Sequence, residues 1–118
     1  MIGTVVEESL KDNRFINKLD VKSVRISDSE EPEDRWHLYK VNITETQIQE
    51  LANQLKPEKW YAHFWDGQDI LAVFSGKTFK FSRTDKSTWK LAIEYGKSIG
   101  IPTEQLDFLI DEDRAGNT

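Results

Sequence analysis

The residues of this chain best suited to acid–base or metal chemistry are its two histidines, His37 and His63. Both lie in segments of strong β-propensity and are expected to point toward aromatic faces. Neither has a carboxylate at a nearby ligand spacing, so the pattern predicts no metal site. The chain contains no cysteine, which excludes disulfides, thiolate catalysis and cysteine-based zinc sites. The sequence therefore predicts no metal ion and no cofactor.

Other motifs that carry chemistry are also missing from the sequence. No G-x-S-x-G turn presents a serine nucleophile, and Gly96 and Gly100 do not form the pattern of a phosphate-binding loop. The stretch from Asp28 to Asp34 contains five carboxylates, but it lacks the glycine and the alternating ligands of a calcium loop. We therefore expect no catalytic residue, and the better interpretation is a protein that is not an enzyme.

Charge and composition narrow the classes of partner. The net charge of −5 over 118 residues argues against general nucleic-acid binding, because contact with phosphates needs an excess of Lys and Arg. The length suits one domain. The first residues do not form a signal peptide, and no apolar run approaches the ~20 residues of a membrane helix. We expect a cytoplasmic protein that contacts neither nucleic acid nor membrane.

The elements that must position any site centre on the region from Lys59 to Arg83, which predicts three antiparallel strands joined by two tight turns. Asp66-Gly67 and Ser75-Gly76 are the predicted turns, because glycine adopts the positive φ that two-residue hairpin loops require. With the first loop at that position, Trp65 is expected to pair with Gln68.

Alternation along these strands divides their side chains between two faces. The first face is aromatic and is predicted to form the core beneath both main helices; it carries Tyr61, His63, Trp65, Ile70, Ala72, Phe74, Phe79 and Phe81. The second face begins apolar and becomes polar by the third strand; it carries Trp60, Ala62, Phe64, Leu71, Val73, Thr78, Lys80 and Ser82. We expect the helices to leave this second face partly uncovered.

Helix signals flank the three strands. The capping-box pattern that begins at Thr44 predicts a helix that stops at Pro57. A second helix is predicted after Asp85, with Trp89 buried and Gly100 at its end. With further β-prone segments before Thr44, residues 1–110 predict a single α+β domain, a mainly antiparallel sheet of about five strands whose two main helices cover one face. Residues 111–118 offer nothing to bury and are expected to form a flexible tail.

Several segments resemble a set of short bacterial proteins that have no established activity. The resemblance rests on the WYAHF segment at residues 60–64, on GKTF at 76–79 and on the region from Tyr95 to Phe108, which contains GIPTEQLDF. The opening VVEESLKD at residues 5–12 is similar too, so the resemblance covers most of the chain. It implies a shared fold and a bacterial source, and it implies no mechanism.

Two functional hypotheses remain open at this point. The first is a small non-catalytic interaction or regulatory module that uses Trp60, Phe64, Leu71 and Val73 to bind another protein or a second copy of the chain as a two-fold homodimer. The alternative is a small-molecule-binding protein or enzyme with a pocket near Tyr61, His63 and Trp65. A flat apolar patch would favour the first hypothesis, and a partly polar cavity beside His63 would favour the second.

Overall fold

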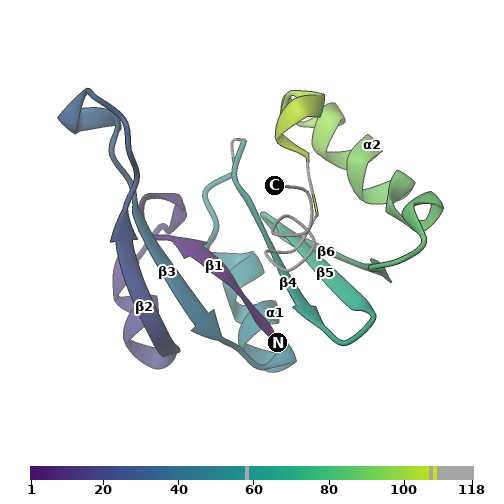
Figure 1. The fold of residues 1–118 in the computed structure, drawn as a ribbon, viewed down its shortest axis with the longest axis horizontal. Coiled ribbons are helices and arrows are strands. Elements are labelled where there is room, and N and C mark those ends of the chain that lie inside the picture. Colours follow the sequence, from purple (N-terminus) through teal and green to yellow (C-terminus); the bar gives the residue numbers. More distant parts are fainter. Residues whose placement is uncertain (58, 107, 109–118) are drawn as a thin grey trace.

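A six-stranded antiparallel sheet forms the centre of the molecule (Figure 1). The computed structural model describes residues 1–57, 59–106 and 108. The strands lie side by side in the order β2-β3-β1-β4-β5-β6, with the bounds β1 Ile2–Val6, β2 Asp20–Ile26, β3 His37–Asn42, β4 Tyr61–Asp66, β5 Asp69–Phe74 and β6 Lys77–Ser82. The α+β class and the antiparallel sheet predicted from the sequence are confirmed, with six strands where about five were expected.

The two main helices, α1 (Glu45–Gln54) and α2 (Lys90–Ser98), pack on opposite faces of the sheet. Alternate residues of β5 show this division, because Leu71 belongs to the core beneath α1 and Ala72 to the core beneath α2. The expectation that both helices cover one face was therefore wrong. Each helix carries a single apolar stripe, and a stripe does not record which face of the sheet it meets.

The face beneath α1 is the better covered of the two. Thr44 and Gln47 form the predicted capping box, with the Thr44 hydroxyl accepting from the Gln47 N–H at 3.1 Å and the Gln47 side chain accepting from the Thr44 N–H at 3.0 Å. The segment that follows β1 packs beside the helix, and Leu10 forms an antiparallel bridge with Leu55. This core contains Val5, Leu10, Phe15, Ile16, Leu19, Val41, Ile43, Ile48, Leu51, Ala52, Leu55, Ala62, Phe64, Leu71 and Val73.

This packing corrects the predicted interaction face. Phe64, Leu71 and Val73 are buried to 0%, 7% and 0% exposure by the chain itself, since α1 and the segment from Leu10 to Leu19 cover them. Trp60 is separate from these residues, because it precedes β4 and contacts Trp36. The apolar surface on which the homodimer was predicted is therefore not available on the folded chain.

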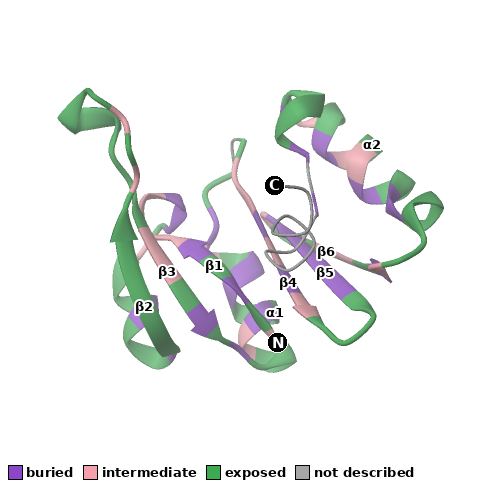
Figure 2. Ribbon diagram, in the orientation of Figure 1, coloured by how far each residue is buried: buried purple, intermediate pink, exposed green. Residues whose placement is uncertain are grey.

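The core beneath α2 is built on β5 and β6, and Tyr61 and Trp65 of β4 are partly buried against it. Trp89 and Ala92 pack there with Phe81 and Phe74, and Phe108 is fully buried among them. The Trp89 indole N–H donates to the Ser82 carbonyl at 2.6 Å, which anchors the helix to the end of β6. In Figure 2 the sheet on this side changes from buried in β5 to exposed in β2.

The three-strand region from β4 to β6 is antiparallel as predicted, but its first turn lies one residue later. Asp66 pairs with Asp69, so the loop is Gly67-Gln68, whereas the second loop is Ser75-Gly76 as expected. The predicted loop Asp66-Gly67 and the observed loop Gly67-Gln68 both contain Gly67, which takes a φ of 58°. The shift changes the partner of Trp65 from Gln68 to Ile70, an even step that leaves the two faces as predicted.

In the described residues no helix is both long enough and apolar enough to cross a membrane. The predicted flexible tail at residues 111–118 lies outside the residues that the structure describes.

Candidate functional site

A hollow of about 560 Å³ lies on the uncovered half of the sheet face that α2 shares. It lies beside the core beneath α2, where β1, β3 and β2 extend the sheet away from β5 and β6. The strand pairings bring its floor together: Ser23 lies opposite Lys40, and Arg25 opposite Leu38. We call this hollow the sheet groove.

Aromatic rings line one side of the sheet groove. Tyr61, His63 and Trp65, at alternate positions of β4, all line it, so the structure brings together the three residues of the predicted pocket. Their rings form a row, with centroids 6.4 Å apart from Tyr61 to His63 and 6.1 Å apart from His63 to Trp65. Phe108 contacts the first two rings edge-on, and the Tyr61 hydroxyl donates to the Gln105 carbonyl.

Three cationic side chains also line the sheet groove. Arg25 comes from β2, Lys40 from β3 and Lys59 from the residue before Trp60. The described residues that line the sheet groove include no carboxylate, although the whole chain carries a net charge of −5. Among the described lining residues, basic side chains thus outnumber acidic ones, and Thr4 and Ser23 add hydroxyl groups to the lining.

A second hollow of about 580 Å³ adjoins the first. The two hollows share Trp36, Lys59, Trp60 and Gln105, and Lys56 and Pro57 line only the second. Trp36 and Trp60 meet edge to face with centroids 5.1 Å apart. Trp36 is 43% exposed, so this ring pair presents indole surface to solvent at the border of the two hollows. We call the second hollow the tryptophan slot.

Sequence reasoning found the rings of β4 but missed the cations and Trp36. The β4 rings could be predicted because they alternate within one strand. Arg25 and Lys40 are distant from β4 in the chain and approach it only through the β2–β3 and β3–β1 pairings. The signal in the sequence is the alternation of side chains along β2 and β3. It places Arg25 and Lys40 on the face of the sheet that the apolar residues of their own strands do not share.

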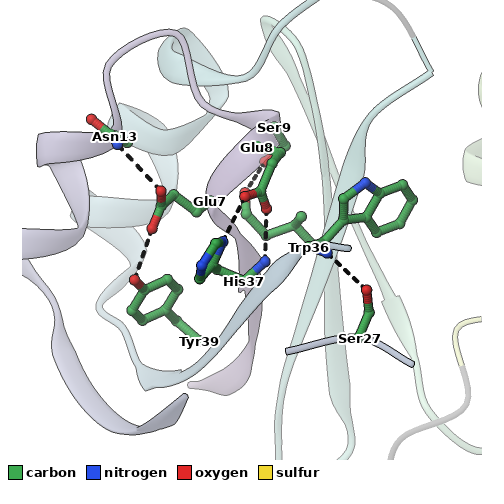
Figure 3. A network of polar contacts seen from close by, with 9 residues as sticks. Glu7, Glu8, Ser9, Asn13, Ser27, Trp36, His37 and Tyr39 are labelled. Carbon is green, nitrogen blue, oxygen red and sulfur yellow. Dashed lines mark hydrogen bonds and ion pairs between the residues drawn. The ribbon is translucent and has the colours of Figure 1, made fainter. Parts of the chain in front are cut away.

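A second cluster joins Glu7 and Glu8 to β3 on the other face (Figure 3). Glu8 accepts from the backbone N–H of His37 at 2.8 Å, and its second oxygen lies 2.8 Å from the His37 ring Nδ1. Glu7 accepts from the Tyr39 hydroxyl at 2.8 Å and from the Asn13 amide at 3.3 Å. The expectation that His37 has no carboxylate nearby was wrong, because the turn after β1 brings both glutamates back to β3.

These contacts shift the pKa values of the cluster. The Glu8 carboxylate raises the pKa of His37 above its usual 6.5, against a smaller opposing effect of burial. Burial raises the pKa of Glu8, but hydrogen bonds from the His37 ring and backbone outweigh it, so the net pKa lies below 4.5. The hydrogen bond to Glu7 raises the pKa of the Tyr39 hydroxyl.

Three possible metal-ligand atoms of Glu7, Glu8 and His37 lie within 4.8 Å of one another. Each of these side chains already has a hydrogen-bond partner in Tyr39, Asn13 or the Glu8–His37 pair itself. The half-exposed His37 ring would have to leave Glu8 to bind an ion through Nδ1. The arrangement thus acts as a clamp between the turn after β1 and the start of β3.

Comparisons with protein-family profiles, with curated proteins and with solved structures found no match.

Proposed function

We propose that this protein binds a small organic anion in the sheet groove. The observation that carries the proposal is the composition of the lining: Arg25, Lys40 and Lys59 line the same hollow as a row of aromatic rings, and no described lining residue is acidic. Charge complementarity of this kind favours a carboxylate, sulfonate or phosphate group near the cations. The rings supply apolar area for the rest of the ligand.

The size of the groove supports a small molecule as the ligand. A volume of about 560 Å³ falls within the roughly 300–1,000 Å³ that small-molecule sites span. The lining combines aromatic rings with polar and charged side chains, so it can offer both apolar contact and groups that orient a ligand. A partly polar cavity beside His63 is the feature that favours small-molecule binding over an interaction module.

The burial of Phe64, Leu71 and Val73 weakens the interaction module in its original form. That hypothesis required an apolar sheet face that no helix covers. In the structure, α1 packs on that face. Binding without catalysis is the simpler proposal, because the cations and aromatic rings of the lining account for a bound anion without a reaction.

A fluorescence titration tests the proposal with 1-anilinonaphthalene-8-sulfonate, an aromatic monoanion whose emission rises in apolar surroundings. We expect saturable binding that Arg25→Glu weakens by about tenfold, the equivalent of roughly 1.4 kcal/mol. The matched control is Lys97→Glu, an equal charge reversal at an exposed position of α2. Equal affinity in wild type and Arg25→Glu, or an equal loss in both variants, would contradict anion binding in the sheet groove.

A further inference from the structure

The tryptophan slot adjoins the sheet groove, and the two hollows share part of their lining. Trp36, Lys59, Trp60 and Gln105 belong to both hollows. A ligand held by Arg25 and Lys40 therefore has a second space within reach, beyond the ring pair at the border. The two hollows differ in the polarity of their lining residues, so they favour different parts of a ligand.

The sheet groove is the more polar of the two hollows. Arg25, Lys40, Thr4 and Ser23 line it and are absent from the slot. The described lining of the slot consists of Trp36, Trp60, Pro57, Gln105 and two lysines. Lysine stems cover apolar surface while their ammonium groups stay in water, so the walls of the slot offer mostly apolar contact.

We infer that the ligand is an elongated amphipathic anion, a carboxylate on an alkyl chain, with its head group in the sheet groove and its chain in the tryptophan slot. The inference deepens the proposed function and rests on it. A flexible chain can follow the border past the edge-to-face rings of Trp36 and Trp60, whose centroids are 5.1 Å apart, whereas a rigid fused-ring body cannot bend there.

The surrounding charges favour one anionic group over many. The loop between β2 and β3 carries five carboxylates from Asp28 to Asp34 and leads directly into Trp36. Arg35 is held at this loop, since its guanidinium donates to the Ser29 and Glu30 carbonyls. A polyanion that extended past Trp36 would approach this acidic loop, whereas an uncharged chain would not be repelled.

The test is displacement of 1-anilinonaphthalene-8-sulfonate by butanoate, octanoate and dodecanoate at equal pH and ionic strength, each below the concentration at which it self-associates. A methylene that becomes fully buried strengthens binding by roughly fourfold. Because the slot is open to solvent on one side, we expect dodecanoate to bind at least tenfold more tightly than octanoate. Equal affinities for the two chains would overturn the inference.

Variants then locate the head and the chain. Trp36→Ala is expected to remove most of the gain in affinity from octanoate to dodecanoate; Leu91→Ala, at a 68% exposed apolar position of α2, is the matched control and should keep that gain. Arg25→Glu is expected to weaken all three acids equally. Circular dichroism and thermal unfolding serve to check that each variant folds. A chain-length gain that persists in Trp36→Ala would overturn the inference.

Lys56, which lines only the slot, tests the direction of binding. If the head group lies in the sheet groove, Lys56→Glu leaves butanoate affinity unchanged, and a loss as large as that in Arg25→Glu would overturn the stated direction. A different result would contradict the proposed function itself: binding of 1-anilinonaphthalene-8-sulfonate that is equally strong in wild type and Arg25→Glu. Dependence on Arg25 without any effect of chain length would leave the proposed function standing and the elongated ligand refuted.

Discussion

The contact between Glu8 and His37 shows how one exposed pair of side chains can tie two segments together. One Glu8 oxygen accepts from the His37 backbone and the other lies 2.8 Å from its ring. Together with Glu7 and Tyr39, 2.8 Å apart, the pair fixes the turn after β1 on the start of β3. The backbone bond does not depend on the charge of the ring, whereas the ring bond strengthens when His37 is protonated.

The shifted pKa values predict a pH window for this stabilisation. His37 has a raised pKa, so its contribution is fully present below 6.5 and is lost as pH rises through the folded-state pKa. Glu8 has a lowered pKa, so its contribution is present above 4.5 and is lost as pH falls through the folded-state pKa. The pair should therefore stabilise most between pH 4.5 and 6.5.

Urea unfolding of wild type and Glu8→Gln at a series of pH values tests this window. The difference in unfolding free energy should be largest inside it and should shrink on both sides. Glu94→Gln, which removes an exposed carboxylate of α2 near Lys90, is the control. A difference that stays constant with pH would show that the ring contact contributes nothing. Proton NMR titration should also show the His37 pKa falling in Glu8→Gln.

At the scale of elements, the seam between β1 and β4 joins the two halves of the sheet. Only Ile2 and Gly3 of β1 pair with β4, opposite Trp65 and Phe64. A Cβ at Gly3 would lie 2.4 Å from the His63 carbonyl oxygen and 2.5 Å from the Phe64 ring. The first of these neighbours is backbone, so the clash cannot be relieved by a side-chain rotation alone.

We therefore predict that Gly3→Ala destabilises the protein by about 1–3 kcal/mol, the usual cost of forcing extra volume into a packed site. Ser23→Ala, on the exposed edge strand β2, should change the unfolding free energy by less than about 0.5 kcal/mol. Urea denaturation measures both values. A neutral Gly3→Ala would mean that β1 and β4 can separate slightly without loss, and that the seam is not tightly packed.

A third prediction concerns the attachment of α2. Trp89 is 5% exposed, packs 5.9 Å from the Phe81 ring by centroids and donates to the Ser82 carbonyl. Trp89→Ala should cost about 3–5 kcal/mol, because it leaves a large cavity under the helix. Leu91→Ala, two positions along and 68% exposed, is the comparison. A loss below about 1 kcal/mol for Trp89→Ala would show that the helix is held by other contacts.

Local features of these elements were predictable because their causes lie within a few residues. The capping box at Thr44 and the second hairpin turn at Gly76 both follow from short-range geometry, and both are present. The first turn was predicted one residue early because Asp66-Gly67 and Gly67-Gln68 each contain the glycine that a tight loop needs.

The placement of the helices was not predictable from the same kind of signal. Both faces of β4 and β5 carry large apolar side chains, Phe64 and Leu71 on one and Phe74 and Ile70 on the other. A single apolar stripe on each helix fits either face, so the sequence pattern does not select between one covered face and two.

At the scale of the whole molecule, the sheet groove depends on the strand order. β1 lies between β3 and β4, so the chain places its first strand at the centre and carries β2 and β3 outward beyond α2. The lining therefore draws on residues from Thr4 to Gln105. No local window contains that combination, which explains why the β4 rings were predicted and the opposing cations were not.

The four tryptophans offer a test of the proposed site with a control inside the same molecule. Trp36, Trp60 and Trp65 line the sheet groove, whereas Trp89 lies under α2 with 5% exposure. In protein labelled with 5-fluorotryptophan, a bound octanoate should shift the fluorine resonances of the first three and leave that of Trp89 in place, because ring environments change only where the ligand lies. Single Trp→Phe variants assign the four signals. A shift confined to Trp89, or equal shifts of all four, would place binding elsewhere or indicate a change of the whole fold, and either result would refute the sheet groove as the binding site.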